Sequence, residues 1–217
     1  MVTTEYRRVR VWTGWARLSH AAIALASIAL LLSGWAIAES PSMAEAASEV
    51  HYLSASVLVF GLIIRLVLMF FSQQHQRLSN LFPASNELGA IAQILRFYLS
   101  FGRLQMPRWY AQNPLWKPVY LVTYIALLLL VITGVFMPES DLLLGFYVPS
   151  VHAFWAQFLL WFSCLHIAAT IWHDYRNETT DVSAMINGYR LFMIEREQGG
   201  ESDAKVQVVT LDSLKQK

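Results

Sequence analysis

The chain has 217 residues, of which 56% are apolar and 14% charged, and its formal net charge is +1. It is too apolar and too poor in charge for an ordinary soluble domain, and its length suits one domain rather than two. The single cysteine, Cys164, excludes an intrachain disulfide and any CxxC motif. Phosphate-binding loops, GxSxG and HExxH are also absent from the sequence, which excludes the common signatures of soluble enzymes.

Four apolar stretches are long enough to cross a bilayer, which takes roughly 20 residues. They run over about 20–38, 51–71, 118–137 and 150–173. Only the second contains a charge well inside it, at Arg65. The sequence therefore predicts an all-α integral membrane four-helix bundle over residues 1–198, followed by a polar tail over 199–217.

Between the second and third spans, apolar residues recur at helical spacing over 86–101, with Glu87 and Arg96 among the intervening positions. Such an amphipathic segment is typical of a helix that lies along the membrane surface. We therefore expect an interfacial helix between spans two and three.

The distribution of Lys and Arg predicts the orientation. All sixteen lie before span one, between spans two and three, in the tail, or at Arg65, whereas the loops over 39–50 and 138–150 contain none. Because cytoplasmic segments are enriched in Lys and Arg, both termini are expected in the cytoplasm. The expected location is the bacterial inner membrane, with the lipid bilayer as one partner and no nucleic acid.

The start of the chain has a competing interpretation. An Arg-rich segment, an apolar run and Ala36-Ile37-Ala38 resemble a signal peptide with its cleavage site. The apolar run is longer than the usual ~7–15 residues of a signal core, and bulky Trp35 adjoins the site. A first membrane span is therefore the better interpretation.

Histidines at four positions in the spans are the candidate functional residues. His152 and His166 are fourteen residues apart, so on a helix they face nearly the same side, about 21 Å apart along the axis. Span one runs outward from His20 and span two inward from His51. Depth alone therefore pairs His51 with His152 at the outer side and His20 with His166 at the inner side.

Two histidines on different helices favour heme over zinc. A structural zinc site takes four protein ligands, whereas a porphyrin supplies four nitrogens itself and needs two axial ligands. Helix bundles commonly hold cofactors between facing helices. The alternative is that each histidine makes an ordinary hydrogen bond across a helix interface. His173 is a weaker ligand candidate than His166, because it adjoins the charged segment Asp174-Tyr175-Arg176.

Four further residues are candidates for contact with the cofactor. Gly34 and Gly134 are small positions where a flat macrocycle could approach the backbone, although close helix packing explains them equally well. Arg65 lies fourteen residues after His51 and needs a partner at that depth. It is expected to pair with a propionate of the inner heme. Arg17 could do the same, or could be an interfacial arginine.

Several motifs resemble those of a known family, the di-heme b-type cytochrome subunits of membrane-bound nickel-iron hydrogenases. That family is related to bacterial cytochrome b561 and to the gamma subunit of formate dehydrogenase. The resemblance covers about 9–192. Its motifs are VRVWTGWARLSH, HYLSASVLVFGLIIR, AQNPLWKPVY, the spacing of His152 and His166, and the tail ending SAMINGYR. The chain departs from the family pattern at Gln112, at Val151-His152 and at Trp172-His173-Asp174.

The resemblance implies two b hemes, with His51 and His152 as the outer ligands and His20 and His166 as the inner ones. It implies a relay between a periplasm-side iron–sulfur subunit, hydrogenase-like, and membrane quinone. The chain would then be an electron-transfer subunit rather than a complete enzyme. Two alternatives stay open: a free-standing cytochrome b561 oxidoreductase that takes electrons from superoxide or another small molecule, and a heme-free membrane anchor for a peripheral enzyme.

Overall fold

The computed structural model describes residues 2–72, 75–107, 109–177 and 181–197. These residues fall into two compact units. The four-helix unit comprises the described residues within 14–79 and 119–169, and the sheet unit comprises the described residues within 2–13, 80–118 and 170–197. The predicted polar tail over 199–217 lies outside the described residues.

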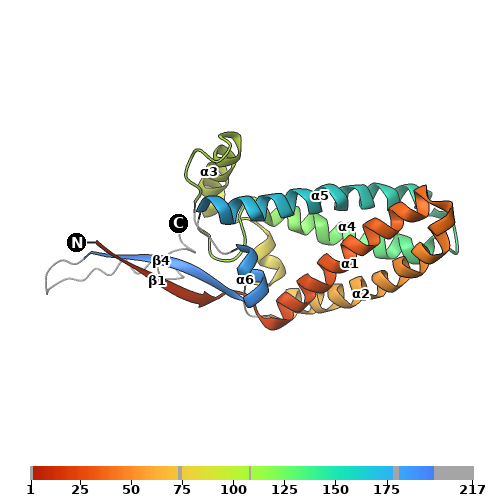
Figure 1. The fold of residues 1–217 in the computed structure, drawn as a ribbon, viewed down its shortest axis with the longest axis horizontal. Coiled ribbons are helices and arrows are strands. Elements are labelled where there is room, and N and C mark those ends of the chain that lie inside the picture. The colour runs from red at the N-terminus through yellow and green to blue at the C-terminus, as the bar shows by residue number, and fades with distance from the viewer. Residues whose placement is uncertain (1, 73–74, 108, 178–180, 198–217) are drawn as a thin grey trace. The chain divides into compact units, whose positions relative to one another are not determined.

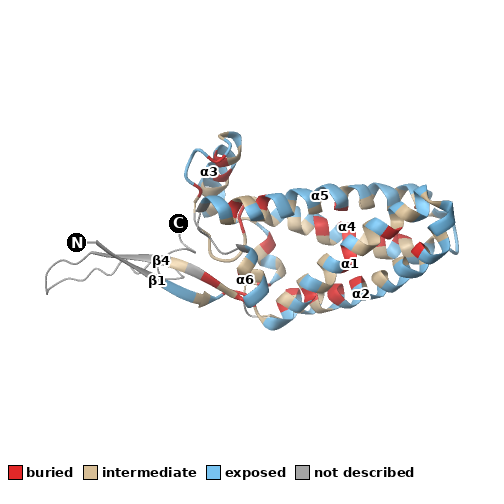
Figure 2. Cartoon of the chain, in the orientation of Figure 1, coloured by how far each residue is buried: buried red, intermediate tan, exposed pale blue. Residues whose placement is uncertain are grey.

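Four long helices, drawn in Figure 1, are apolar enough to cross a membrane. They are α1 (Gly14–Glu39), α2 (Ala44–Phe71), α4 (Lys117–Phe136) and α5 (Val148–Asn177). Many large apolar side chains on them are exposed; Leu25 is 68% exposed and Leu53 70%. The exposed residues are pale blue along the ribbons of these helices in Figure 2. Lipid, and not water, is the solvent that suits such a surface, and helices satisfy their backbone hydrogen bonds internally in lipid. The predicted membrane four-helix fold is therefore confirmed.

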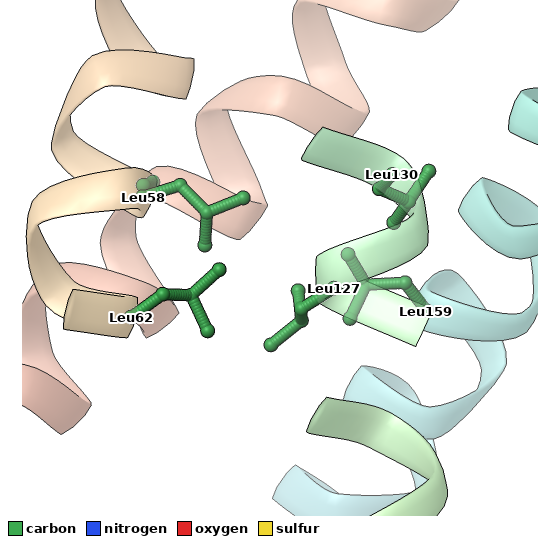
Figure 3. Packing of buried hydrophobic residues seen from close by; sticks show 6 residues of the cluster. Leu58, Leu62, Leu127, Leu130 and Leu159 are labelled. Atoms are coloured by element: carbon green, nitrogen blue, oxygen red, sulfur yellow. The ribbon is translucent and has the colours of Figure 1, made fainter. Parts of the chain in front are cut away.

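The core of the four-helix unit consists largely of leucines that point inward from different helices. Leu58 and Leu62 of α2 lie near Leu127 and Leu130 of α4 and Leu159 of α5 (Figure 3). Ala26 of α1 completes this buried cluster. These contacts hold the helices at fixed levels relative to one another, which is the condition for positioning ligands on different helices.

Short connections join the helices. A 3-10 turn, η1 (Pro41–Met43), links α1 to α2. Strands β2 (Leu142–Leu143) and β3 (Phe146–Tyr147) form a hairpin between α4 and α5. Its two turn residues, Leu144 and Gly145, both have positive φ, as a two-residue hairpin turn of type I′ requires.

The sheet unit contains α3 (Leu88–Leu99), preceded by the 3-10 turn η3 (Ser85–Glu87). Ile94, Phe97 and Met106 form its buried cluster. Leu88, Leu95 and Leu99 remain exposed on α3. The helix predicted over 86–101 is thus present, slightly shorter at both ends. Another short turn, η2 (Leu78–Leu81), precedes this region.

A two-stranded antiparallel sheet joins the two ends of the described chain. Strand β1 (Val2–Arg10) pairs with β4 (Tyr189–Glu197), with Val2 opposite Glu197 and Arg10 opposite Tyr189. Helix α6 (Asp181–Asn187) leads into β4 through Gly188, whose φ is 88°. The carbonyl of Gly188 accepts hydrogen bonds from the amides of Val11 and Trp12. The sequence reading did not include this sheet.

Candidate functional site

The four span histidines lie in two pairs within the four-helix unit. His20 of α1 and His166 of α5 have ring centres 6.3 Å apart. His51 of α2 and His152 of α5 have ring centres 6.4 Å apart. All four side chains are partly buried. The structure thus brings together the two pairs that helical depth predicts.

The separation within each pair suits two ligands on opposite sides of one metal ion. A ligating imidazole nitrogen lies about 2 Å from the metal, with the ring centre roughly 1 Å further, so two such rings have centres about 6 Å apart. Among the described residues, no group of three or more His, Cys, Asp or Glu side chains could hold a metal. Each pair therefore fits a metal whose other ligands come from a porphyrin, as in bis-histidine heme ligation.

Hydroxyl groups hold both rings of the His51–His152 pair. The Oγ of Ser33 on α1 lies 2.9 Å from Nδ1 of His51. The Oγ1 of Thr133 on α4 lies 2.8 Å from Nδ1 of His152. Both bonds engage Nδ1 and leave Nε2 as the nitrogen available to a metal, and such contacts orient metal-ligating histidines.

Glycines adjoin the same two rings. A Cβ at Gly34 would lie 3.5 Å from Cε1 of His51, and a Cβ at Gly134 would lie 3.5 Å from Cε1 of His152. Each predicted glycine thus follows a hydroxyl residue that contacts the same histidine. The observed neighbour of both glycines is an imidazole, and their predicted contact with a macrocycle stays a prediction.

Aromatic rings and a cation surround the His20–His166 pair. The ring of Phe162 stacks on His166 with centres 5.4 Å apart, and Tyr120 meets it edge-on at 5.8 Å. Arg65 of α2 is 6% exposed and is close enough to His20 for their charges to interact. Arg17 is partly buried, three residues before His20. Arg65 and Arg17, the two predicted cations, therefore lie near the His20–His166 pair rather than near the His51–His152 pair.

Arg65 makes no salt bridge with the described residues. Its Nε is buried without a hydrogen-bond partner there. Its guanidinium lies over the ring of Tyr124, with Cζ 5.2 Å from the centre. A buried cation of this kind fits an anionic group, such as a propionate, that comes with a bound cofactor.

His173, the weaker ligand candidate, belongs to the sheet unit. It is 3% exposed, and its Nε2 lies 2.7 Å from the hydroxyl of Tyr98. That hydroxyl also accepts a hydrogen bond from Nε1 of Trp116 at 3.0 Å, so Tyr98 links the other two side chains. Sequence reasoning did not find this buried network. The spacing of Tyr98 on α3 gave no indication of a partner 75 residues away.

Four membrane helices that bring paired histidines together at heme-ligand separation define a membrane cytochrome b. The model of the family described as prokaryotic cytochrome b561 matches residues 11–188 of this chain. The chain therefore belongs to the prokaryotic cytochrome b561 family, a heme b-binding, multi-pass bacterial membrane family with an electron-transfer role. This confirms the b561 relationship that its motifs predicted. Comparisons with curated proteins and with solved structures found no match.

Proposed function

We propose that the protein is a di-heme membrane cytochrome b that relays electrons between a periplasm-side iron–sulfur redox subunit and the quinone pool. The observation that carries this proposal is the presence of two histidine pairs, with ring centres 6.3 Å and 6.4 Å apart. Each pair takes one histidine from α5, and these two α5 residues, His152 and His166, are fourteen positions apart. A helix rises about 21 Å over that interval. Two cofactors at two depths can carry charge across most of an apolar core of about 30 Å.

The chain's own residues would hold the cofactors as follows. His51 and His152 would ligate the outer heme, and His20 and His166 the inner heme. Arg65 would neutralise a propionate at the inner level, with Arg17 as a second candidate cation. The hemes supply reversible one-electron chemistry when bound, and the protein sets their environment by ligation, burial and hydrogen bonding.

A difference spectrum tests the di-heme proposal. The purified protein is measured reduced minus oxidised, with heme quantified per chain, for the wild type, His152→Ala and His166→Ala. We expect two b hemes in the wild type and loss of a different heme in each variant. His75→Ala is the control, because His75 lies outside both pairs. A wild-type protein with no heme would overturn the proposal and favour the membrane anchor.

The electron donor needs its own experiment. The tail ending SAMINGYR and the resemblance to hydrogenase subunits favour a large iron–sulfur partner, whereas the family match is to cytochrome b561 in general. Affinity purification from native membranes in mild detergent should retain an iron–sulfur polypeptide. If the chain instead purifies alone, with both hemes, and reduces quinone with superoxide as donor, the free-standing oxidoreductase is the correct function.

A further inference from the structure

The hydroxyls of Ser33 and Thr133 each contact a histidine and two carbonyl groups of the preceding turn of their own helix. Ser33 Oγ donates to the carbonyl of Ala29 at 2.7 Å, and Thr133 Oγ1 donates to the carbonyl of Leu129 at 2.7 Å. Because each hydroxyl has only one proton, its contact with the histidine must be as an acceptor. Nδ1 of both histidines therefore carries the hydrogen, and Nε2 carries the lone pair that a metal needs.

The two hydroxyls are built into the core of the four-helix unit. Ser33 and Thr133 are each 5% exposed. They occupy matching positions, one residue before Gly34 on α1 and one residue before Gly134 on α4. The glycines leave room for the imidazoles to come this close to the neighbouring helices. His51 and His152 are thus held in the same tautomer, each by a hydroxyl group that accepts a hydrogen bond from Nδ1.

An acceptor on Nδ1–H has a definite electronic effect on a ligating imidazole. It increases the basicity of the ring and strengthens donation from Nε2. Stronger donation stabilises the oxidised metal more than the reduced metal and so lowers the midpoint potential. Two such acceptors act on the His51–His152 site.

The other site has the opposite electrostatic environment. Arg65 is buried, carries a positive charge and interacts through space with His20. A nearby positive charge favours the state with the extra electron, and burial strengthens the effect because the local dielectric constant is low. The midpoint potential at His20–His166 is raised accordingly.

We infer that Ser33 and Thr133 are positioning residues that lower the midpoint potential of the His51–His152 heme, while Arg65 raises that of the His20–His166 heme. An added electron is then more stable at the His20–His166 level. The inference rests on the proposed di-heme function and assigns an order of potentials that ligation alone does not give.

An equilibrium redox titration, followed by absorbance, tests the inference on the full-length protein in detergent or nanodiscs. Ser33→Ala and Thr133→Val each remove one acceptor, and we expect the lower-potential component to move upward while the higher one stays in place. The double variant should show the larger shift. Ser33→Thr and Thr133→Ser retain a hydroxyl and should keep the wild-type potentials. Arg65→Gln should lower the higher-potential component.

Matched controls exist on the same two helices. Thr123→Val removes a buried hydroxyl of α4 that also donates to the carbonyl four residues earlier, Val119. Ser27→Ala removes a buried hydroxyl of α1 that has no hydrogen-bond partner among the described residues. Neither change should move either potential.

The possible outcomes separate the inference from the proposed function. A wild type with fewer than two hemes per chain refutes the di-heme proposal itself. Two hemes with unchanged potentials in Ser33→Ala, equal shifts in the controls, or shifts of the same size in Ser33→Thr and Thr133→Ser would overturn the inference alone. If Thr133→Val loses a heme, the potentials of Ser33→Ala test the inference instead, because that change deletes one oxygen and leaves the Thr133–His152 contact intact.

Discussion

The guanidinium of Arg65 lies over the ring of Tyr124, with its Cζ 5.2 Å from the ring centre. This places a cation from α2 against an aromatic ring of α4, inside a helix bundle whose core is otherwise dominated by leucine. A cation–π contact of this kind stabilises by about 0.5–2 kcal/mol. That is less than the cost of several kcal/mol for placing an unpaired charge in a low-dielectric interior. No ion pair of Arg65 among the described residues offsets the rest of this cost, which is consistent with the proposed pairing of Arg65 with a heme propionate.

Replacement of Arg65 by leucine should therefore have opposite effects on the protein with and without heme. Without heme, we expect Arg65→Leu to be neutral or stabilising, because it removes a buried charge. With heme, breaking a buried ion pair costs about 3–5 kcal/mol, so the variant should retain less of one heme. Thermal unfolding of both forms, together with heme per chain, measures this. Equal destabilisation of both forms would show that Arg65 only packs.

Gly61 of α2 lies directly against α1. A Cβ at this position would lie 3.0 Å from the side chains of both Ala22 and Ile23, and 3.2 Å from the backbone nitrogen of Ile23. Because a backbone atom cannot swing away, Gly61→Val should destabilise the four-helix unit by about 1–3 kcal/mol. Gly89→Ala is the control: a Cβ at Gly89 meets nothing within 4 Å. Unfolding in detergent should show a lower midpoint for the Gly61 variant alone.

The fold was largely predictable because each membrane helix can be recognised from its own segment of the sequence. A long apolar run is sufficient evidence for each span. The helices extend beyond the predicted spans: α1 begins at Gly14 and α2 at Ala44, whereas the spans were expected to start at about 20 and 51. Arg17 and Glu45 lower the local hydropathy without ending the helix, since both lie near helix ends. The strands β1 and β4 were missed because their pairing joins opposite ends of the chain, and nothing in either segment specifies its partner.

The candidate site was predictable in its histidines and not in their supports. Helical geometry places His152 and His166 on one face from spacing alone. Ser33 and Thr133 were missed because a hydroxyl in an apolar helix commonly bonds the preceding turn, as both do here. A signal was nevertheless present: Ser33-Gly34 and Thr133-Gly134 lie near the ends of two spans, with Ser33 18 residues before His51 and Thr133 19 residues before His152. The repetition of that pattern distinguishes it from chance packing.

Gly134 can distinguish contact with an imidazole from contact with a macrocycle. An alanine methyl would lie 3.5 Å from Cε1 of His152, an ordinary van der Waals distance. If the ring alone faces this glycine, Gly134→Ala should keep both hemes, whereas Gly134→Leu should displace the ring and lose one. Heme per chain and the difference spectrum give the answer. Loss of a heme in the alanine variant would instead support direct approach of the macrocycle to the backbone.

The hydroxyl of Tyr98 should make the sheet unit sensitive to alkaline pH. Burial raises the pKa of Tyr98 above its usual 10.0, and the hydrogen bond from Trp116 opposes this in part. Since the folded-state pKa is the higher one, the stabilisation is fully present below pH 10 and is lost as pH rises through the folded-state pKa. Tyr98→Phe should lower stability at neutral pH by about 1 kcal/mol and flatten the alkaline limb. Unfolding midpoints from pH 7 to pH 11 test this. An unchanged alkaline limb in Tyr98→Phe would refute it.

The orientation can be tested with single cysteines, because Cys164 is the only native one. Ser42 in η1 and Ser79 in η2 are both exposed and lie at opposite ends of α2. In a Cys164→Ala background, a membrane-impermeant maleimide applied to intact spheroplasts should label Ser42→Cys. It should label Ser79→Cys only after the membrane is permeabilised. The reason is that the loop containing Ser42 has no Lys or Arg, whereas cationic residues follow Ser79, and cytoplasmic loops carry the positive charge. The reverse labelling pattern would place both termini outside and exchange the outer and inner histidine pairs.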